Sequence, residues 1–571
     1  MSLQLTSQSN LEGLRKDAKR WLKALRAGEL QALERLARIH PGYRAPALRT
    51  VQHALALEYG FPNWAALKQE LEQRALAARS HAERVTLFLE KSANRYNVAP
   101  GSAQWNTYEP DRPARGELAA RLLARHPEIA RDSIHTAVAA HDIEAVHEFL
   151  AKDPSLANQP GGPDGWTPLL RLAYTRVPIE ALSHSATGIA TALLDYGAAP
   201  NVSWSDSQNA FTVLTGVIGG GEGGQAAHPQ AEALSRLLIA RGADPFDPQA
   251  LYNTSLGPDS VVWLELLWSE SDKRGEAARW TTLVNGLGAG SGVSAIDYLL
   301  GNAVPQHPKR VEWLLEHGAN AKAINSYSKT PVIKHAVLAG AQEVIDLLVR
   351  YGAEQPALSD AEGFVAAAMQ GDELTLRRLA DGHPDYLRSP HAMFAAIRQH
   401  RTDIAELLLG LGMSPNVSDH KGFSALHFTT HCGAAEIATL LIARGADVDP
   451  VERSYNSTPL GHANYQGRPE MVAVLAPISR DIRGLCFAGA VGRLAELLAA
   501  DRSLACAITR GGEAPLFALP DDDDRAVDVA EFLLAHGADP SAKNGAGLTP
   551  AQAAKKRGLE EAAAATNAAE P

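Results

Sequence analysis

The sequence of 571 residues predicts an all-α fold, a solenoid of stacked helix pairs that a small helical domain precedes. The first observation is a phrase that recurs six times, as in LLIARGADP, WLLEHGANA and FLLAHGADP. The second is its period, which is 34 residues from Gly318 to Gly352 and 33 residues from Gly412 to Gly445. The third is an upstream element that contains Thr-Pro or a close variant, as in GWTPLLRLA, NSTPLGHAN and GLTPAQAAK. A period of this length is typical of an array of helical repeats.

Each repeat contains the residues that begin and end a helix. Thr458 is a good N-cap, because its hydroxyl can accept a hydrogen bond from an early helix N–H, and Pro459 suits the first helical position, whose N–H has no partner. In AAEIATLLIARGAD the apolar residues follow helical spacing, and Gly445 supplies the left-handed residue that ends the helix. One such unit cannot bury its own apolar stripe, so neighbouring units must stack.

These residues resemble the ankyrin-repeat family, whose unit is a β-turn finger followed by two antiparallel helices, with a Thr-Pro-Leu-His signature opening the first helix. The resemblance implies that fingers project from the array and that the first helices line a concave face. It also implies a protein that binds partner proteins through these two surfaces, with no enzymatic activity and no cofactor.

The stretch SALHFTTHCG raises the alternative of a metal site, because His427 and His431 lie four residues apart and share one face of a helix. Metalloproteases with this spacing need a Glu directly after the first His, where this chain has Phe428. In the register of the signature, the resemblance implies that His427 bonds to the turn and to the neighbouring repeat. In the next repeat, the positions that correspond to His431 and the cysteine after it are occupied by Tyr465 and a glutamine. Neither is a plausible zinc ligand. We therefore predict no bound metal, with His431 and Tyr465 exposed on the first-helix side.

Weaker units fill the gaps between the clear copies, so we predict one array over residues 132–561. Residues 81–131 are predicted to form a helical connector or a degenerate first repeat, and residues 562–571 a disordered tail. Four insertions, which include the glycine-rich GVIGGGEGGQAAHPQ and the acidic PDDDDR, are predicted to lie between the two helices of their repeats. The first lacks the Gly-Lys-Ser/Thr ending of a phosphate loop and the second lacks EF-hand spacing, so both are interpreted as solvated loops.

The N-terminal segment, residues 1–80, is predicted to be a separate helical domain. From Leu14 onward apolar residues share one helical face and basic residues cover much of the rest, a pattern that can bind a membrane surface or nucleic acid. Later glutamates interrupt the charge, and Asn63 caps a helix before Trp64, which favours a small packed domain. Residues 11–75 resemble a leader found before ankyrin arrays in bacterial proteins, a resemblance that implies no particular activity.

Composition excludes several classes of protein. No run of eighteen apolar residues exists and the N-terminus lacks the apolar core of a secretory signal, so the sequence predicts a cytoplasmic protein without a membrane span. Cys432, Cys486 and Cys506 are widely spaced, which argues against a disulfide framework. The net charge of -11 argues against a nucleic-acid partner for the chain as a whole.

Two classes of function fit these observations. The first is a non-enzymatic scaffold or regulator that binds an unidentified protein, and the second is an enzyme whose site is formed by inserted loops. We favour the first, because no nucleophile with a base and no repeated ligand set is visible. Nucleic-acid or membrane attachment through the basic N-terminal helix is a further alternative. The predicted partner-binding residues are aromatic or histidine side chains of fingers and first helices: Trp204, Tyr327, His420, His431, Tyr455 and Tyr465.

Overall fold

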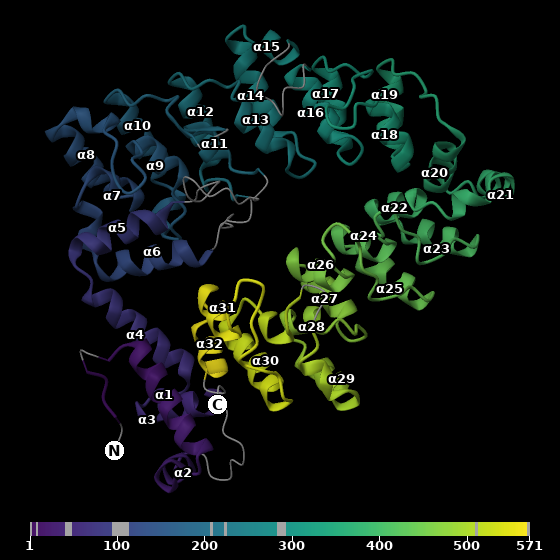
Figure 1. The fold of residues 1–571 in the computed structure, drawn as a ribbon. Coiled ribbons are helices and arrows are strands. Elements are labelled where there is room, and N and C mark those ends of the chain that lie inside the picture. Colours follow the sequence, from purple (N-terminus) through teal and green to yellow (C-terminus); the bar gives the residue numbers. More distant parts are fainter. Residues whose placement is uncertain are drawn as a thin grey trace. The chain divides into compact units, whose positions relative to one another are not determined.

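The regular secondary structure of the computed structural model is almost all helical (Figure 1). The chain divides into two compact units, residues 1–78 together with 358–571, and residues 79–357. The structure describes residues 3–6, 9–39, 48–93, 113–205, 209–221, 225–282, 293–508 and 512–567.

The first unit begins with the N-terminal module, which comprises the described residues of 9–78. Its helices are α1 (Leu11–Arg26), α2 (Leu30–Ala37), α3 (Leu48–Glu58) and α4 (Trp64–Ala78). The side chain of Asn63 accepts the N–H of Ala66 (2.8 Å), which confirms the predicted cap. Helix α1 packs against α2, α3 and α4, and its apolar face is buried: Leu14, Ala18, Trp21, Leu22 and Leu25. That face is therefore not open to a membrane surface in this structure.

The rest of the first unit is a row of helix pairs joined by fingers and short turns. The first three pairs and a 3₁₀ turn are α20 (Asp360–Gln370), α21 (Glu373–Gly382), η4 (Pro384–Leu387), α22 (His391–Arg398), α23 (Thr402–Gly410), α24 (Ala425–Cys432) and α25 (Ala435–Ala443). The remaining elements are α26 (Pro459–Tyr465), α27 (Pro469–Leu475), α28 (Ile482–Phe487), α29 (Val491–Ala500), η5 (Arg502–Ala505), η6 (Pro515–Phe517), α30 (Asp523–Ala535), α31 (Pro550–Lys556) and α32 (Glu560–Asn567).

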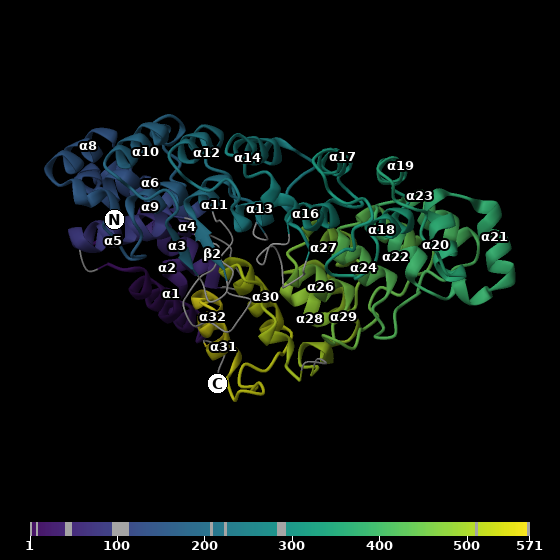
Figure 2. The same cartoon turned by 90° about the horizontal axis from the view of Figure 1, so that it is seen from above.

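These pairs stack with like helices side by side. The first helices α22, α24, α26 and α28 contact one another in succession (Figure 2). The second helices α23, α25 and α27 do the same. The hydroxyl of Thr458 accepts the N–H of Gly461 (3.0 Å), and Gly445 has a φ of +88° after α25, so the predicted start and stop signals are confirmed. The stacked pairs bury apolar side chains between them, and Leu426, Leu441 and Leu460 are almost fully covered.

The second unit has the same construction. Its elements up to the hairpin are α5 (His81–Ser92), α6 (Pro113–Arg125), η1 (Pro127–Arg131), α7 (Ile134–Ala139), α8 (Ile143–Lys152), η2 (Pro154–Asn158), α9 (Pro168–Tyr174), η3 (Glu180–Ser183), α10 (Ala186–Asp195), β1 (Ser203–Ser205) and β2 (Ala210–Thr212). Those that follow are α11 (Val213–Ile218), α12 (Ala231–Ala240), α13 (Pro248–Ser255), α14 (Val262–Lys273), α15 (Ala278–Thr281), α16 (Ala295–Ala303), α17 (Pro308–Glu316), α18 (Val332–Ala339) and α19 (Gln342–Arg350).

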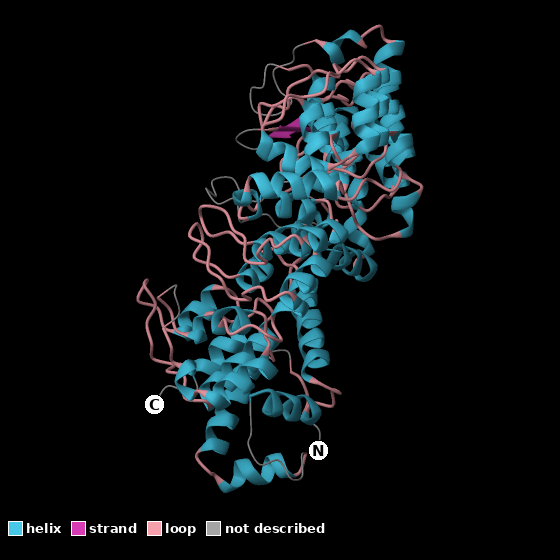
Figure 3. Ribbon diagram, turned by 90° about the vertical axis from the view of Figure 1, so that its right-hand side faces the viewer, coloured by secondary structure: helices cyan, strands magenta, loops and turns pink. Residues whose placement is uncertain are grey.

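The strands β1 and β2 form an antiparallel hairpin, with Trp204 opposite Phe211, and this hairpin is the finger before α11 (Figure 3). The described residues of the first three insertions lie about the junctions of α9 with α10, α11 with α12 and α16 with α17, as predicted, whereas PDDDDR follows the 3₁₀ turn η6 and its last three residues begin α30. Helix α5 packs against α6 and against α7, as a degenerate first repeat would.

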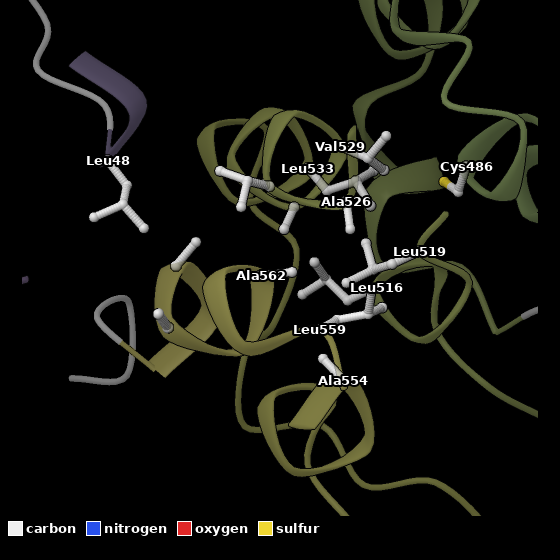
Figure 4. Packing of buried hydrophobic residues seen from close by; sticks show 14 of the residues in the cluster. Leu48, Cys486, Leu516, Leu519, Ala526, Val529, Leu533, Ala554, Leu559 and Ala562 are labelled. Atoms are coloured by element: carbon white, nitrogen blue, oxygen red, sulfur yellow. The ribbon is translucent and has the colours of Figure 1, made fainter. Parts of the chain in front are cut away.

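The predicted disordered tail is wrong over residues 562–567. These residues belong to α32, and Ala562 to Thr566 are buried. Helix α32 packs against α30 and α31, and Figure 4 shows Ala562 and Leu559 converging with Ala526, Leu533 and Leu516. An alanine-rich end does not predict this burial, because it depends on what covers the helix. Residues 568–571 lie outside the described residues.

Candidate functional site

His427 is buried in α24, where it connects two repeats. Its Nδ1 accepts the N–H of Ser424 (3.2 Å), so the ring proton is on Nε2, which donates to the carbonyl oxygen of Ser457 in the next finger (3.0 Å). Burial lowers the pKa of His427 to about 4, so the ring is neutral near pH 7. Because both ring nitrogens are engaged, His427 has no lone pair for a metal. The bonding that the resemblance implied, to the turn and the neighbouring repeat, is confirmed.

The residues that the structure describes offer no other metal-binding arrangement. None of their His, Cys, Asp or Glu side chains gather in a group of three or more that could hold a metal ion. The acidic insertion is engaged in the fold, since Asp521 pairs with Arg557 (2.7 Å) and Asp522 accepts a backbone N–H at the start of α30 (2.9 Å). The side chain of Asp524 lies outside the described residues. Within the described ranges, no helix is both long and apolar enough to cross a membrane.

Two insertions of the second unit place polar groups against His141. The His141 and His228 rings lie 6.0 Å apart, and burial, followed by Arg176, lowers the pKa of His141 to about 4 and that of His228 to about 2. The His141 Nδ1 lies 2.9 Å from the Ser185 hydroxyl, which donates to a backbone carbonyl (2.8 Å). So weak a base beside a hydroxyl whose proton is already used does not favour nucleophilic catalysis. Residues 222–224 of the glycine-rich insertion lie outside the described part of the chain.

A hollow of about 530 Å³ lies between η4 and the turn that follows α23. Its polar lining comes from Arg388, Ser414, Asn416 and Ser418. The side chains that line it include no His, Cys, Asp or Glu, so the hollow offers no general base for a serine. This arrangement gives the enzyme alternative no support.

The first helices α22, α24 and α26 each present a side chain at the same register position. Arg398, His431 and Tyr465 lie two residues before the residue that ends the helix, whose φ is between +51° and +71°. All three side chains are exposed, and Tyr465 is 75% exposed. Since α24 contacts both α22 and α26, these residues form a row across three adjacent repeats, the exposed row. The exposure of His431 and Tyr465 agrees with the prediction.

Aromatic rings of α22 and α24 pack next to the exposed row. Phe394 of α22 stacks on Phe428 of α24 with ring centroids 4.4 Å apart, and the Phe428 and His431 rings are 6.0 Å apart. The Arg398 guanidinium lies 5.4 Å from the centre of the Phe428 ring, within the range of a cation–π interaction. Sequence reasoning missed Arg398, Phe394 and Phe428. The signal was the common register of the first helices, which becomes visible when they are aligned on the residue that ends each helix.

The finger before α26 holds Tyr455 on a rigid base. The Glu452 side chain is 1% exposed and accepts the backbone N–H groups of Ser454, Tyr455 (2.8 Å) and Ser457 (3.3 Å). Burial alone would raise the pKa of Glu452, but these N–H donors lower it overall, so the carboxylate stays charged. Tyr455 is 79% exposed. A side chain fixed at its backbone and open to solvent is suited to binding a partner.

The remaining predicted residues lie in other fingers. His420 is exposed in the finger before α24. This finger is hydrogen-bonded to the finger of Tyr455, because the Arg453 N–H donates to the Lys421 carbonyl oxygen (2.9 Å). The structure therefore places His420 and Tyr455 in neighbouring fingers of the first unit, beside the helices of His431 and Tyr465.

Trp204 and Tyr327 belong to the second unit and are less free. Trp204 is half-buried, with its ring 4.5 Å from Phe211 and 5.7 Å from Trp166, so it is part of an aromatic cluster and not an open finger tip. Tyr327 is 63% exposed, but its hydroxyl lies 2.6 Å from that of Tyr298. The side chains of both residues remain partly exposed to solvent.

Comparison with known proteins agrees with this geometry. Residues 392–483 match the family model for ankyrin repeats, in three copies. This chain carries ankyrin repeats. The matched ankyrin segment contains the exposed row and the fingers of His420 and Tyr455. Ankyrin repeats generally mediate protein–protein interaction.

A curated relative, among others that match, shares a segment with this chain. It is the B-cell lymphoma 3 protein homolog of Mus musculus, which is 28% identical over 165 residues. The aligned segment is 29% of this chain and 32% of that protein. The chain therefore spans about a third of the length of this relative.

Proposed function

We propose that this chain is a non-enzymatic scaffold or regulator that binds a protein partner through the ankyrin repeats of its first unit. The surface comprises the exposed row, Arg398, His431 and Tyr465, together with Tyr455 on the neighbouring finger. The observation that carries the proposal is the row itself. Recurrence of exposed aromatic and cationic side chains at one register position of three adjacent helices gives a continuous surface, which single exposed residues do not.

The chemistry of this surface favours a partner with both carboxylates and apolar side chains. Tyr455 and Tyr465 offer large rings whose burial costs little conformational entropy, as hot-spot residues do. Arg398 and His431 can donate hydrogen bonds to carboxylates. His420 is proposed as a secondary contact of this surface, since it lies in an adjacent finger. Tyr327 and Trp204 belong to the second unit, so they are proposed as separate partner contacts there, each with only part of its surface open.

A cytoplasmic location is part of the proposal. The described cysteines, Cys432, Cys486 and Cys506, are all unpaired, as is usual in a reducing compartment. We also propose that the chain has no enzymatic activity and no cofactor. Two observations support this: His141 is a weak base, and the lining of the hollow near Ser414 includes no His, Cys, Asp or Glu that could act as a general base.

The experiment is capture of partners from an extract of the native host, with the wild-type chain and the double variant Tyr455→Ala, Tyr465→Ala. Each hot spot contributes about 2 kcal/mol or more, which is roughly thirty-fold in affinity, so the double variant should lose about a thousand-fold in affinity for the captured protein if the two contributions add. The matched control is Leu374→Ala, because Leu374 is 82% exposed on the second helix α21, away from the row. A folded double variant that captures the same protein as strongly as wild type would overturn the proposal.

A further inference from the structure

The N-terminal module lies against the last repeat of the same unit, although hundreds of residues separate them in sequence. Helix α1 contacts α32, and buried residues of the module and of the last repeats belong to one hydrophobic cluster (Figure 1). Leu48 of the module belongs to the same cluster of buried hydrophobic residues as Leu533 and Ala562 (Figure 4). The contact therefore has an apolar component.

Glu561 in α32 is the polar centre of this contact. Its side chain is 1% exposed. The carboxylate accepts the indole N–H of Trp64 (3.0 Å) and the amide of Gln52 (3.0 Å), and it pairs with Arg15 (3.3 Å). The Lys68 ammonium lies 3.7 Å away. All four groups come from the module, and an unpartnered carboxylate would be costly at so buried a position.

A second anchor involves α30. The Glu531 carboxylate accepts the backbone N–H of Leu48 at the start of α3, and Arg49 pairs with Asp528 (2.7 Å). The acidic side of α30 and α32 therefore faces donors and basic side chains of the module. This complementarity gives the contact a defined register as well as its apolar area.

The last helix is covered as an internal helix would be. Terminal repeats of a solenoid usually have a polar outer face, because nothing stacks beyond them. Helix α32 has the sequence EEAAAATN, and every residue from Glu561 to Thr566 is buried. Helices α30 and α31 cover part of α32, and α1 of the module contacts it as well.

We propose that the N-terminal module is a separate docked cap, which binds in cis to the acidic face of α30 and α32 and shields the apolar surface of the last repeat. The Glu561 carboxylate anchors the cap through Trp64, Gln52 and Arg15. The cap holds by non-covalent contacts alone, and the chain that follows α4 is not needed to keep it in place.

The test cuts the chain after it has folded. A protease recognition sequence is inserted between Ala78 and Arg79, where α4 ends and Arg79 is exposed, and the purified full chain is cleaved and passed through a size-exclusion column at micromolar concentration. The module should co-elute with residues 79–571. If the module and residues 79–571 are both folded but elute as two separate peaks at this concentration, and not together at the elution volume of the uncut chain, the proposal is overturned.

Two variants test the named anchors. Glu561→Gln removes the charge and presents an amide to donors, so it should raise the dissociation constant at least ten-fold. Arg49→Ala lies on the module and should raise it by a smaller factor, without disturbing the last repeat. The control Glu436→Gln changes an exposed carboxylate of α25 and should have no effect.

Hydrogen exchange of α30 and α31 then separates undocking from unfolding. If Glu561→Gln unfolds the last repeat, Arg49→Ala decides the matter, because this variant leaves the array intact. Retention of the module at wild-type affinity in Arg49→Ala and in a folded Glu561→Gln chain would contradict the anchoring. The experiment needs no external partner, so its result does not depend on the proposed function.

Discussion

Replacing His427 with alanine tests whether this histidine is a structural link between repeats. The change removes the Nε2 donor to Ser457 and leaves the buried N–H of Ser424 without its acceptor. A lost hydrogen bond costs about 1 kcal/mol and an unsatisfied buried group about 1–3 kcal/mol, so the free energy of unfolding should fall locally by about 2–4 kcal/mol. Ring contacts with Phe423 and His462, at 5.2 and 5.3 Å between centroids, add to this loss.

Hydrogen exchange is the suitable assay, because long repeat arrays do not unfold in a single step. His427→Ala should speed exchange in α24 and in the finger at 450–457, while the second unit stays unchanged. The matched control is His431→Ala, whose exposed side chain should cost no more than about 0.5 kcal/mol. Equal effects of the two variants would refute the structural role. Stoichiometric zinc in the wild-type protein, lost in either variant, would show that the metal alternative was right.

Two further predictions concern stability. Burial lowers the pKa of His427, His135 and His141 from 6.5 to about 4, so the unfolded chain takes up protons before the folded chain does. The contribution of these histidines to the free energy of unfolding should be fully present above about pH 6.5 and be lost as the pH falls toward 4. Chemical denaturation that gives the same free energy of unfolding at pH 7 and pH 4.5 would contradict this. Leu441→Ala should cost about 2–5 kcal/mol because Leu441 is fully buried, whereas the half-buried neighbour Leu440 should cost less, and urea unfolding that ranks the two variants the other way would show that the core is placed wrongly.

Local signals in the sequence were enough to predict the repeat. The contacts that begin and end a helix involve residues only a few positions apart, as at Thr458, Pro459 and Gly445. The helix starts and stops could therefore be predicted without knowing the neighbouring repeats. The role of His427 was implied by the resemblance to the ankyrin signature, and the structure shows its bond to Ser457 of the next finger. The positions of the first three insertions followed from the repeat period.

The features that sequence reasoning missed depend on distant residues. Trp204 was predicted as an open finger residue, but Trp166, 38 positions earlier, packs against its ring. The burial of α32 depends on Trp64 and Gln52, about 500 residues away. Of the three residues in the exposed row, His431 and Tyr465 were predicted and Arg398 was missed, because Arg398 lies in a repeat that lacks the Thr-Pro signature. No local pattern reports contacts of this range.

Site-specific crosslinking tests the central claim most directly, because it reports which surface a partner touches. A photoreactive benzoylphenylalanine would replace Tyr465, His431 or, as a control on the second-helix side, Leu374, and the intact chain would be irradiated in the native host. The account predicts one and the same protein adduct from positions 465 and 431 and none from position 374. An adduct that forms at position 374 but not at the two positions of the exposed row would contradict it.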